Sequence, residues 1–291
     1  STDVPRYRAG DLDMTSYALP PEQFAKLQKE LPGEVFTTRT LATYSYELNN
    51  KKAPFDNVNV RKALNLSLDR NVITDKVLGQ GQTPTYVFTP TYIEEGHLIQ
   101  QPAYSKEPMA QRNEEAIKLL EEAGYSKANP LKFSILYNTN ENHKKVAIAA
   151  ASMWKANTKG LIDVKLENQE WKTYIDSRRA GRYDAARAGW NADYNQATTF
   201  GNYFLSNSSN NTAKYANPEY DKAIAESYVA TDAEGRAKAY AKAEEILAKD
   251  FGIVPIFNYV NPRLVKPYVK GYSGKDPQDH IYLRNLYIIK H

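Results

Sequence analysis

The sequence predicts an α/β protein in which a mixed, mainly parallel sheet is flanked by helices. Three strand-like segments, at residues 131–137, 162–167 and 183–189, alternate with two helical ones. This order and spacing is typical of parallel strands joined by right-handed crossovers. With 291 residues, of which 42% are hydrophobic and 25% charged, the chain can bury a substantial core, so a disordered chain is excluded.

The first quarter of the chain predicts a helix, a long strand and two more helices. A proline pair at 20–21 opens the first helix, which ends near Pro32. Residues 35–48 are rich in Thr, Tyr and Val and predict a strand. Asp56 and Asp69 are each placed to cap the helix that follows.

The middle of the chain supplies the elements that alternate with the predicted strands. Residues 79–110 are punctuated by glycine and proline, so we expect a long surface excursion there. Residues 113–123 predict an amphipathic helix that Gly124 ends. Helices over 142–157 and 171–180 would then connect the three strands.

Beyond the third strand, a short helix at 194–205 precedes two longer ones. Asn217 caps the first of these, and Thr231 and Glu234 have capping-box spacing for the second, which runs to about Lys249.

The last part of the chain predicts strands. Residues 252–260 indicate a buried strand, in which Pro255 marks an edge or a bulge. The remaining tail is strand-like and interrupted by turns.

Composition and motifs exclude several classes of function. No apolar run approaches the ~18 residues of a membrane span. The net charge is only +4 and its signs are mixed along the chain, which gives little support for nucleic-acid binding. The absence of cysteine excludes disulfides and thiol chemistry. No metal-ligand spacing, phosphate-binding loop or hydrolase motif is present, so we expect no metal and no cofactor.

The stretch RAGWNADYN, residues 187–195, gathers a cation, a glycine, an aromatic ring and a carboxylate at the carboxyl end of the third predicted strand. Open α/β sheets bind ligands at such ends. Arg187 lies among alanines, where an unpaired charge is costly to bury, so it needs an internal carboxylate or an anionic ligand. Asp193 is either an acceptor for a ligand or the cap of the short helix.

Six stretches, taken in order, carry a resemblance to a known family. They are PFDNVNVRKALNLSLDR (54–70), RNEEAIKLLEEAGY (112–125), VKLENQEWKTY (164–174), RAGWNADYN (187–195), SNSSNNTAKY (206–215) and IVPIFNYVNPRLVKP (253–267). In these stretches the chain resembles the peptide class of periplasmic solute-binding proteins, family 5, whose oligopeptide-binding members serve ABC importers. The resemblance covers essentially the whole chain.

The resemblance implies a lobe like those of type II periplasmic binding proteins. Members of the family are much longer, and about their first half has no counterpart here, so we expect a C-terminal portion. Residues 42–260 would form the second, peptide-binding lobe. Residues 1–41 would be a remnant of the first lobe, and 261–291 its C-terminal return segment. We expect these two flanks to pair with each other, because both are strand-rich and would otherwise expose sheet edges.

The function that the resemblance implies is capture of oligopeptides in the periplasm, by their charged termini and backbone, for delivery to a permease in the inner membrane. We expect a monomer without enzymatic activity that does not bind nucleic acid. Three alternatives stay open. One is a relative specific for murein tripeptide or dipeptides. A second is an α/β hydrolase with Asp193 as its acid, although a nucleophile–base set is lacking. A third is an interaction domain that uses the surface of its 22 tyrosines.

The resemblance also implies roles for charged residues. Asp193 would bind the peptide amine, and Arg187 and Arg178 its carboxylate, with His143 assisting. Glu47 would lie near the side-chain pockets and favour basic peptides. From the sequence alone, Arg178 fits a solvated helix face and His143 an exposed turn equally well.

Five further residues would contact the peptide backbone or its side chains. Trp171 and Trp190 would wall side-chain pockets, with ordinary core packing as the alternative. Tyr259 would touch the backbone or line a pocket. Gly189 and Asn191 would offer backbone groups to an extended ligand, as in strand addition.

Overall fold

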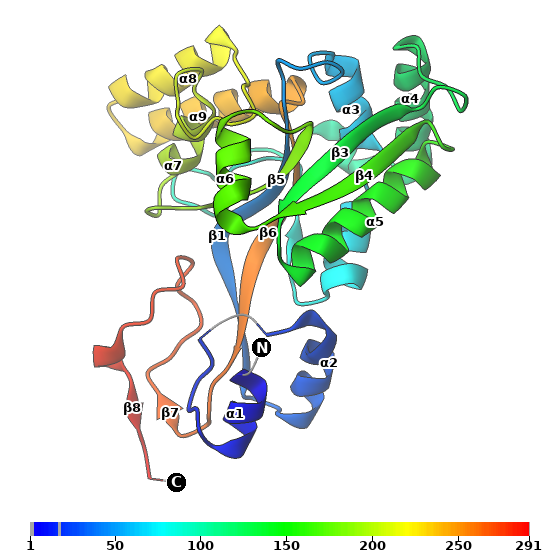
Figure 1. Cartoon of the computed structure of the whole chain (residues 1–291). Helices are drawn as coiled ribbons and strands as arrows, with labels where there is room; N and C mark the ends of the chain where they lie inside the picture. Colours follow the sequence, from blue (N-terminus) through cyan, green and yellow to red (C-terminus); the bar gives the residue numbers. More distant parts are fainter. Residues whose placement is uncertain (1–2, 17–18, 291) are drawn as a thin grey trace.

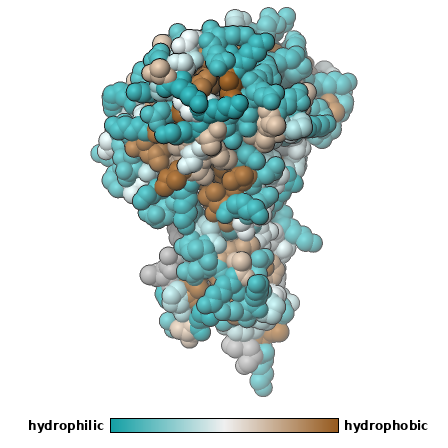
Figure 2. All heavy atoms as spheres, turned by 90° about the vertical axis from the view of Figure 1, so that its right-hand side faces the viewer, coloured by the Kyte–Doolittle hydropathy of each residue, from teal (hydrophilic) through white to brown (hydrophobic). Residues whose placement is uncertain are grey.

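The computed structural model describes residues 3–16 and 19–290 and consists of two unequal bodies joined by two long strands (Figure 1). Strands β1 (Val35–Leu48) and β6 (Ile253–Leu264) pair antiparallel and run from the small lower body into the large upper one. Figure 2 shows the narrowing between the bodies from the side, with a surface that is mostly hydrophilic. No helix in the described ranges is long and apolar enough to cross a membrane.

The two bodies contain the following elements. The helices are α1 (Asp3–Ala9), α2 (Pro21–Glu30), α3 (Val58–Leu66), α4 (Met109–Glu122), α5 (Glu141–Asn157), α6 (Trp171–Arg179), α7 (Thr198–Gly201), α8 (Pro218–Val229) and α9 (Ala233–Lys249). The remaining strands are β2 (Thr83–Pro84), β3 (Leu131–Asn138), β4 (Ile162–Gln169), β5 (Ala185–Asn191), β7 (Val269–Lys270) and β8 (Tyr287–Ile288). Short π or 3₁₀ turns are η1 (Val72–Leu78), η2 (Ala103–Lys106), η3 (Asn202–Phe204) and η4 (Leu283–Asn285).

Six strands form one mixed sheet in the order β2-β6-β1-β5-β3-β4. The predicted parallel unit is confirmed, because β3 pairs parallel with both β4 and β5. Parallel pairing is limited to this unit, so the expected predominance of parallel pairs is wrong. The reason is that β1 and β6 enter from the lower body and pair antiparallel with their neighbours rather than joining the crossover series.

The sheet separates two apolar cores. Side chains alternate along a strand, so Tyr44 and Tyr46 of β1 pack into one core together with Trp154 of α5. Leu41 contributes to the other core, in which Phe200 and residues of α8 and α9 are buried. Helices α3, α4 and α5 therefore cover one face of the sheet, and α7, α8 and α9 the other.

Two predicted helix caps are corrected. Asn57, not Asp56, caps α3, because the helix begins at Val58 and the Asn57 side chain accepts a first-turn amide. Asp232, not Thr231, caps α9 in the same way. In both cases the residue directly before the helix places its short acceptor over the free N–H groups.

The segment 79–110 is mostly irregular, as predicted, but it is not confined to the surface. Residues 85–90 are buried. The Thr43 hydroxyl donates to the carbonyl of Phe88 (2.7 Å). The Glu244 carboxylate accepts hydrogen bonds from the amides of Phe88 and Thr89. These polar contacts tie the excursion between the sheet and α9, which a pattern of glycine and proline does not reveal.

The predicted irregularity at Pro255 is confirmed as a bulge. The β1–β6 register shifts between the pairs Tyr44–Phe257 and Ser45–Pro255. Strand β6 is not an edge here, since β1 and β2 flank it.

The flanks of the chain pair with each other, as predicted. The amide of Thr15 donates to the carbonyl of Leu264 (3.0 Å), and the amide of Lys266 to that of Asp13 (2.9 Å). The lower body is therefore built from both flanks, around the lower ends of β1 and β6 (Figure 1).

A fully buried arginine ties the upper body together. Arg70 Nε donates to the carbonyl of Pro255 (2.6 Å) in β6, and its other nitrogens donate to the carbonyl and side-chain oxygens of Asn65 (both 3.1 Å). Its guanidinium carbon lies 4.0 Å from the centre of the Tyr86 ring. Within the described ranges, no carboxylate pairs with Arg70.

We expect Arg70→Met to lower the free energy of unfolding by about 3 kcal/mol or more, because it leaves buried carbonyls without donors. Urea denaturation measures the change. Arg182→Met, at an exposed position, serves as the control. Equal stability of the two variants would contradict a structural role for Arg70.

Candidate functional site

A groove of about 660 Å³ lies where the upper and lower bodies meet, at the carboxyl end of β5. Its lining comes from β1, β5, β6, the start of α6 and residues 277–279. Five of the residues that the sequence singles out line this groove: Trp171, Arg187, Gly189, Asn191 and Tyr259.

The alternation of β5 decides which residues reach the groove. Arg187, Gly189 and Asn191 lie on one face, opposite Tyr46, Tyr44 and Ala42 of β1 in the strand register. Trp190 lies on the other face. Its indole N–H donates to the carbonyl of Thr199 (2.9 Å), and its ring meets that of Tyr203 edge to face. Trp190 therefore packs in the core and does not line the groove. Trp171, in contrast, is 58% exposed.

Arg187 has polar partners but no counter-charge. One terminal nitrogen donates to the Tyr259 hydroxyl and the other to the Asn138 side-chain oxygen (3.4 Å). The guanidinium lies 5.2 Å from the centre of the Tyr44 ring, and its Nε is buried without a hydrogen-bond partner. No carboxylate pairs with Arg187 in the described part of the chain, so the internal Asp or Glu that the sequence left open is not found there.

The surroundings of Arg187 keep it charged and keep His143 neutral. Burial by itself lowers the pKa of Arg187. The nearby Tyr259 and Tyr44 hydroxyls have the larger combined effect and raise this pKa above its usual value. Burial, and then repulsion by Arg187, lower the pKa of His143 to about 3. The His143 ring lies 5.6 Å from that of Tyr44, and its buried Nδ1 has no partner within residues 3–16 and 19–290. His143 is thus enclosed beside Arg187 rather than in an exposed turn.

Gly189 leaves room for this arrangement. A Cβ atom at this position would lie 2.7 Å from a terminal nitrogen of Arg187 and 3.1 Å from the Tyr259 hydroxyl. A side chain at this position would therefore require the end of the Arg187 side chain to shift.

Asp193 is exposed just past the end of β5 and does not cap a helix. The predicted helix start at 194 is wrong, because α7 begins at Thr198 after a series of bends. Among the described residues, the Asp193 carboxylate accepts a hydrogen bond only from the Thr199 hydroxyl (3.4 Å), and its backbone carbonyl accepts one from the Gln278 side chain (3.4 Å). It therefore presents an accessible negative charge beyond the groove.

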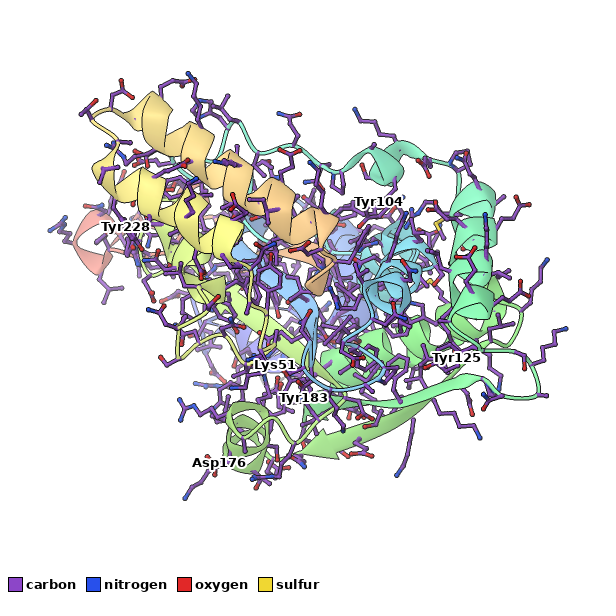
Figure 3. The ribbon with its side chains drawn as sticks, turned by 90° about the horizontal axis from the view of Figure 1, so that it is seen from above. Lys51, Tyr104, Tyr125, Asp176, Tyr183 and Tyr228 are labelled. Carbon is purple, nitrogen blue, oxygen red and sulfur yellow. The ribbon has the colours of Figure 1, made fainter. Side chains whose placement is uncertain are left out.

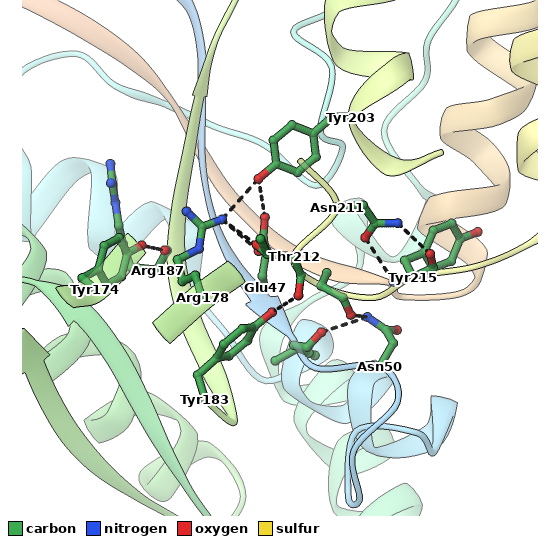
Figure 4. Close-up of polar contacts among 12 residues, drawn as sticks. Glu47, Asn50, Tyr174, Arg178, Tyr183, Arg187, Tyr203, Asn211, Thr212 and Tyr215 are labelled. Carbon is green, nitrogen blue, oxygen red and sulfur yellow. Dashed lines mark hydrogen bonds and ion pairs between the residues drawn. The ribbon is translucent and has the colours of Figure 1, made fainter. Parts of the chain in front are cut away.

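Arg178 and Glu47 form a buried ion pair on the opposite face of the sheet from Arg187 (2.9 Å; Figure 4). The Tyr203 hydroxyl donates to the Glu47 carboxylate (2.6 Å), as does that of Thr212, and Arg178 also donates to the Thr212 hydroxyl (3.0 Å). The solvated helix face considered for Arg178 is wrong. The two charges neutralise each other away from the groove.

Sequence reasoning missed two neighbours of Arg187. Tyr44 was part of the strand expected at 35–48 but was not singled out. Asn138 lies at the carboxyl end of β3, which pairs parallel with β5. Carboxyl ends of parallel strands meet at one edge of a sheet, so the alternation of predicted strands contained a signal for Asn138.

Comparisons with known proteins agree on one family. A sequence model described as bacterial extracellular solute-binding proteins, family 5 Middle, matches residues 2–212. The periplasmic oligopeptide-binding protein OppA of Haemophilus influenzae is 96% identical over 291 residues, and that of Salmonella typhimurium 55% over 290. These matches cover 100% of this chain but 54% and 53% of the relatives. The chain therefore spans about half the length of the curated relatives it matches.

Solved structures show the same architecture. The complex of H. influenzae OppA with RPPGFSPFR superposes with a TM-score of 0.92 at 95% identity, over 99% of this chain and 56% of that one. The murein tripeptide binding protein MppA of Escherichia coli superposes with a TM-score of 0.90 at 43% identity, over 100% of this chain and 56% of that one.

We expect Glu47→Gln and Arg178→Met each to destabilise the fold by about 3–5 kcal/mol, because each leaves a buried partner without its counterpart. The double variant Glu47→Gln/Arg178→Met should lose less than the sum of the single changes, which urea denaturation can measure. The exposed pair of Lys249 and Glu245 is the matched control, with an expected effect below about 1 kcal/mol. Additive losses at Glu47 and Arg178 would argue against their coupling.

We expect acid to weaken the fold through His143. Its pKa is about 3 in the folded chain against 6.5 for the free side chain, so protonation favours unfolding. The stabilisation is complete above pH 6.5 and is lost as the pH falls toward 3. Between pH 7 and pH 5 the wild type should lose about 1–2 kcal/mol more than His143→Gln. Denaturation curves of the two proteins that shift in parallel with pH would refute this.

Proposed function

The chain belongs to family 5 of the bacterial extracellular solute-binding proteins, and from that membership we propose that it supplies one wall of a peptide-binding site. The site would take short peptides by their charged ends and backbone in the periplasm. The periplasmic placement and the peptide ligand come from the names of the OppA relatives.

The observation that carries the proposal is the cation at Arg187. It lines an open groove, it is held in place by Tyr259 and Asn138, and it has no carboxylate partner among the described residues. Its buried Nε and the buried Nδ1 of His143 both lack partners. A peptide carboxylate is the ligand group that supplies the missing charge and the missing acceptor.

The other end of a peptide needs a carboxylate, and Asp193 offers one. Between Arg187 and Asp193, the exposed strand end at Gly189 and Asn191 carries backbone groups for an extended ligand, and Trp171 provides an exposed ring at the same groove. Arg178, Glu47 and Trp190 are excluded from direct ligand contact in this proposal, because their groups are occupied on the other face of the sheet.

The same groove suggests how the chain is organised. We assign residues 42–260 to the second lobe and the flanks 1–41 and 261–291 to the first lobe, with β1 and β6 as the connection between them. Closure of a complete first lobe over the groove would exclude water and strengthen the contacts at both peptide ends.

The biological role follows from the family. The protein would act as a monomer without catalytic activity and would deliver peptides to an ABC permease in the inner membrane. Mass spectrometry of ligands that co-purify with the full-length protein separates the alternatives. Mixed short peptides support a general oligopeptide carrier, whereas one murein tripeptide or a set of dipeptides supports a specialised one.

We expect the 291-residue chain alone to bind the nonapeptide RPPGFSPFR weakly, because a complete site would bury the peptide between two walls. The free acid should bind roughly tenfold more tightly than its C-terminal amide, since only the acid forms a charged hydrogen bond with Arg187. In Arg187→Met this difference should disappear. Titration followed by NMR measures all four affinities.

Arg182→Met, which changes an exposed arginine away from the groove, should keep the preference for the acid. Nanomolar binding by the chain alone would contradict the need for a second wall. Equal affinity of the acid and the amide for the wild type would contradict the role of Arg187.

A further inference from the structure

A second groove, larger than the first, lies on the upper body. Its volume is about 930 Å³, within the roughly 300–1,000 Å³ that small-molecule sites occupy. It is lined by α3, α4, α9 and residues 98–107, and its lining residues are different from those of the Arg187 groove. Figure 3 shows from above how the segment that carries Tyr104 runs between α9 and α4.

The lining of this groove is mainly apolar. Ala241 and Ala248 are seven residues apart on α9 and therefore lie on one helix face, where their short side chains leave space. The rings of Tyr104 and Phe251 meet at 5.7 Å and provide an aromatic wall. Phe251 adopts a φ of 48° because it ends α9 in the left-handed conformation, in which the amides of Phe251 and Gly252 donate to the carbonyls of Ala248 and Leu247.

On the charged rim, one carboxylate oxygen has no hydrogen-bond partner among the described residues. Lys62 pairs with Glu115 (2.5 Å), Lys249 with Glu245 (2.6 Å) and Lys242 with Glu226 (3.3 Å), so these six charges are neutralised. Lys238 also lines the groove and has no ion pair within the described residues. Glu107 lines the same groove, and its Oε2 is buried without a hydrogen-bond partner in the described part of the chain. A buried carboxylate oxygen without a donor is unfavourable, and native structures usually supply the donor from a bound group or an ordered water.

We propose that this groove is a second binding site, separate from the peptide groove, for a small molecule that has an aromatic body and one ammonium group. The ammonium donates to the Glu107 carboxylate in a charge-assisted hydrogen bond. The aromatic body packs on Tyr104 and Phe251 above the alanines of α9. Lys238, which also lines the groove, disfavours a second positive charge on the ligand.

The test uses 2-phenylethylamine and its uncharged analogue 2-phenylethanol, titrated into the 291-residue chain and followed by NMR. We expect saturable binding of the amine and at least roughly tenfold weaker binding of the alcohol, because only the amine forms the charged hydrogen bond. Glu107→Gln should weaken binding of the amine by a similar factor. Glu121→Gln, at an exposed position of α4 outside the groove, should leave its affinity unchanged.

Two further variants distinguish the two grooves. Ala248→Phe fills the proposed site and should abolish binding of the amine. Arg187→Met changes the Arg187 groove and should leave the affinity for the amine unchanged. Failure of the amine to saturate, equal affinity for the alcohol, or loss of binding in Arg187→Met but not in Glu107→Gln would each overturn the proposal. If Ala248→Phe fails to fold, the affinity of Glu107→Gln for the amine tests the proposal, because this substitution keeps the shape of the side chain. None of these outcomes depends on peptide binding.

Discussion

The pairing of β1 with β6 is the constraint on which the rest of the structure depends. These two strands form the centre of the six-stranded sheet and also extend into the lower body, where both flanks of the chain pair around them. Strand β1 fixes the register of β5, and β5 carries Arg187, Gly189 and Asn191 of the first groove. A shift of one residue between β1 and β5 would move Arg187 to the other face of the sheet.

Two arginines on opposite faces of the sheet illustrate how environment decides the role of a charge. Arg178 meets Glu47, two hydroxyl groups and an apolar core, and the resulting network is closed to solvent. Arg187 donates to the neutral oxygens of Asn138 and Tyr259 and lies beside the Tyr44 ring at the wall of an open groove. The first arrangement satisfies its charges internally and stabilises the fold. The second leaves a charge that an anionic ligand can satisfy, which is why only Arg187 enters the proposed function.

Much of the fold could be predicted because it depends on local patterns. The strands at 35–48 and 131–137 and the helix that Asn217 caps are set by residue alternation and by capping chemistry within a few positions. The errors have local causes as well. Neighbouring residues such as Asp56 and Asn57 are equally good caps by type, and only the actual start of the helix chooses between them. The buried part of segment 79–110 escaped prediction because distant side chains, Thr43 and Glu244, satisfy its backbone.

The sequence by itself determined the strand and helix order, the position of RAGWNADYN at a strand end and the family resemblance. It also contained the alternation that places Arg187, Gly189 and Asn191 on one face and Trp190 on the other. Only the tertiary structure decided which charges are paired, since Glu47 and Arg178 are far apart along the chain and meet through sheet formation. The same holds for the second groove, in which Tyr104 and Glu107 come from one segment and Phe251 from another that is distant along the chain. Pair interactions between distant segments depend on packing, and packing has no local signal in the sequence.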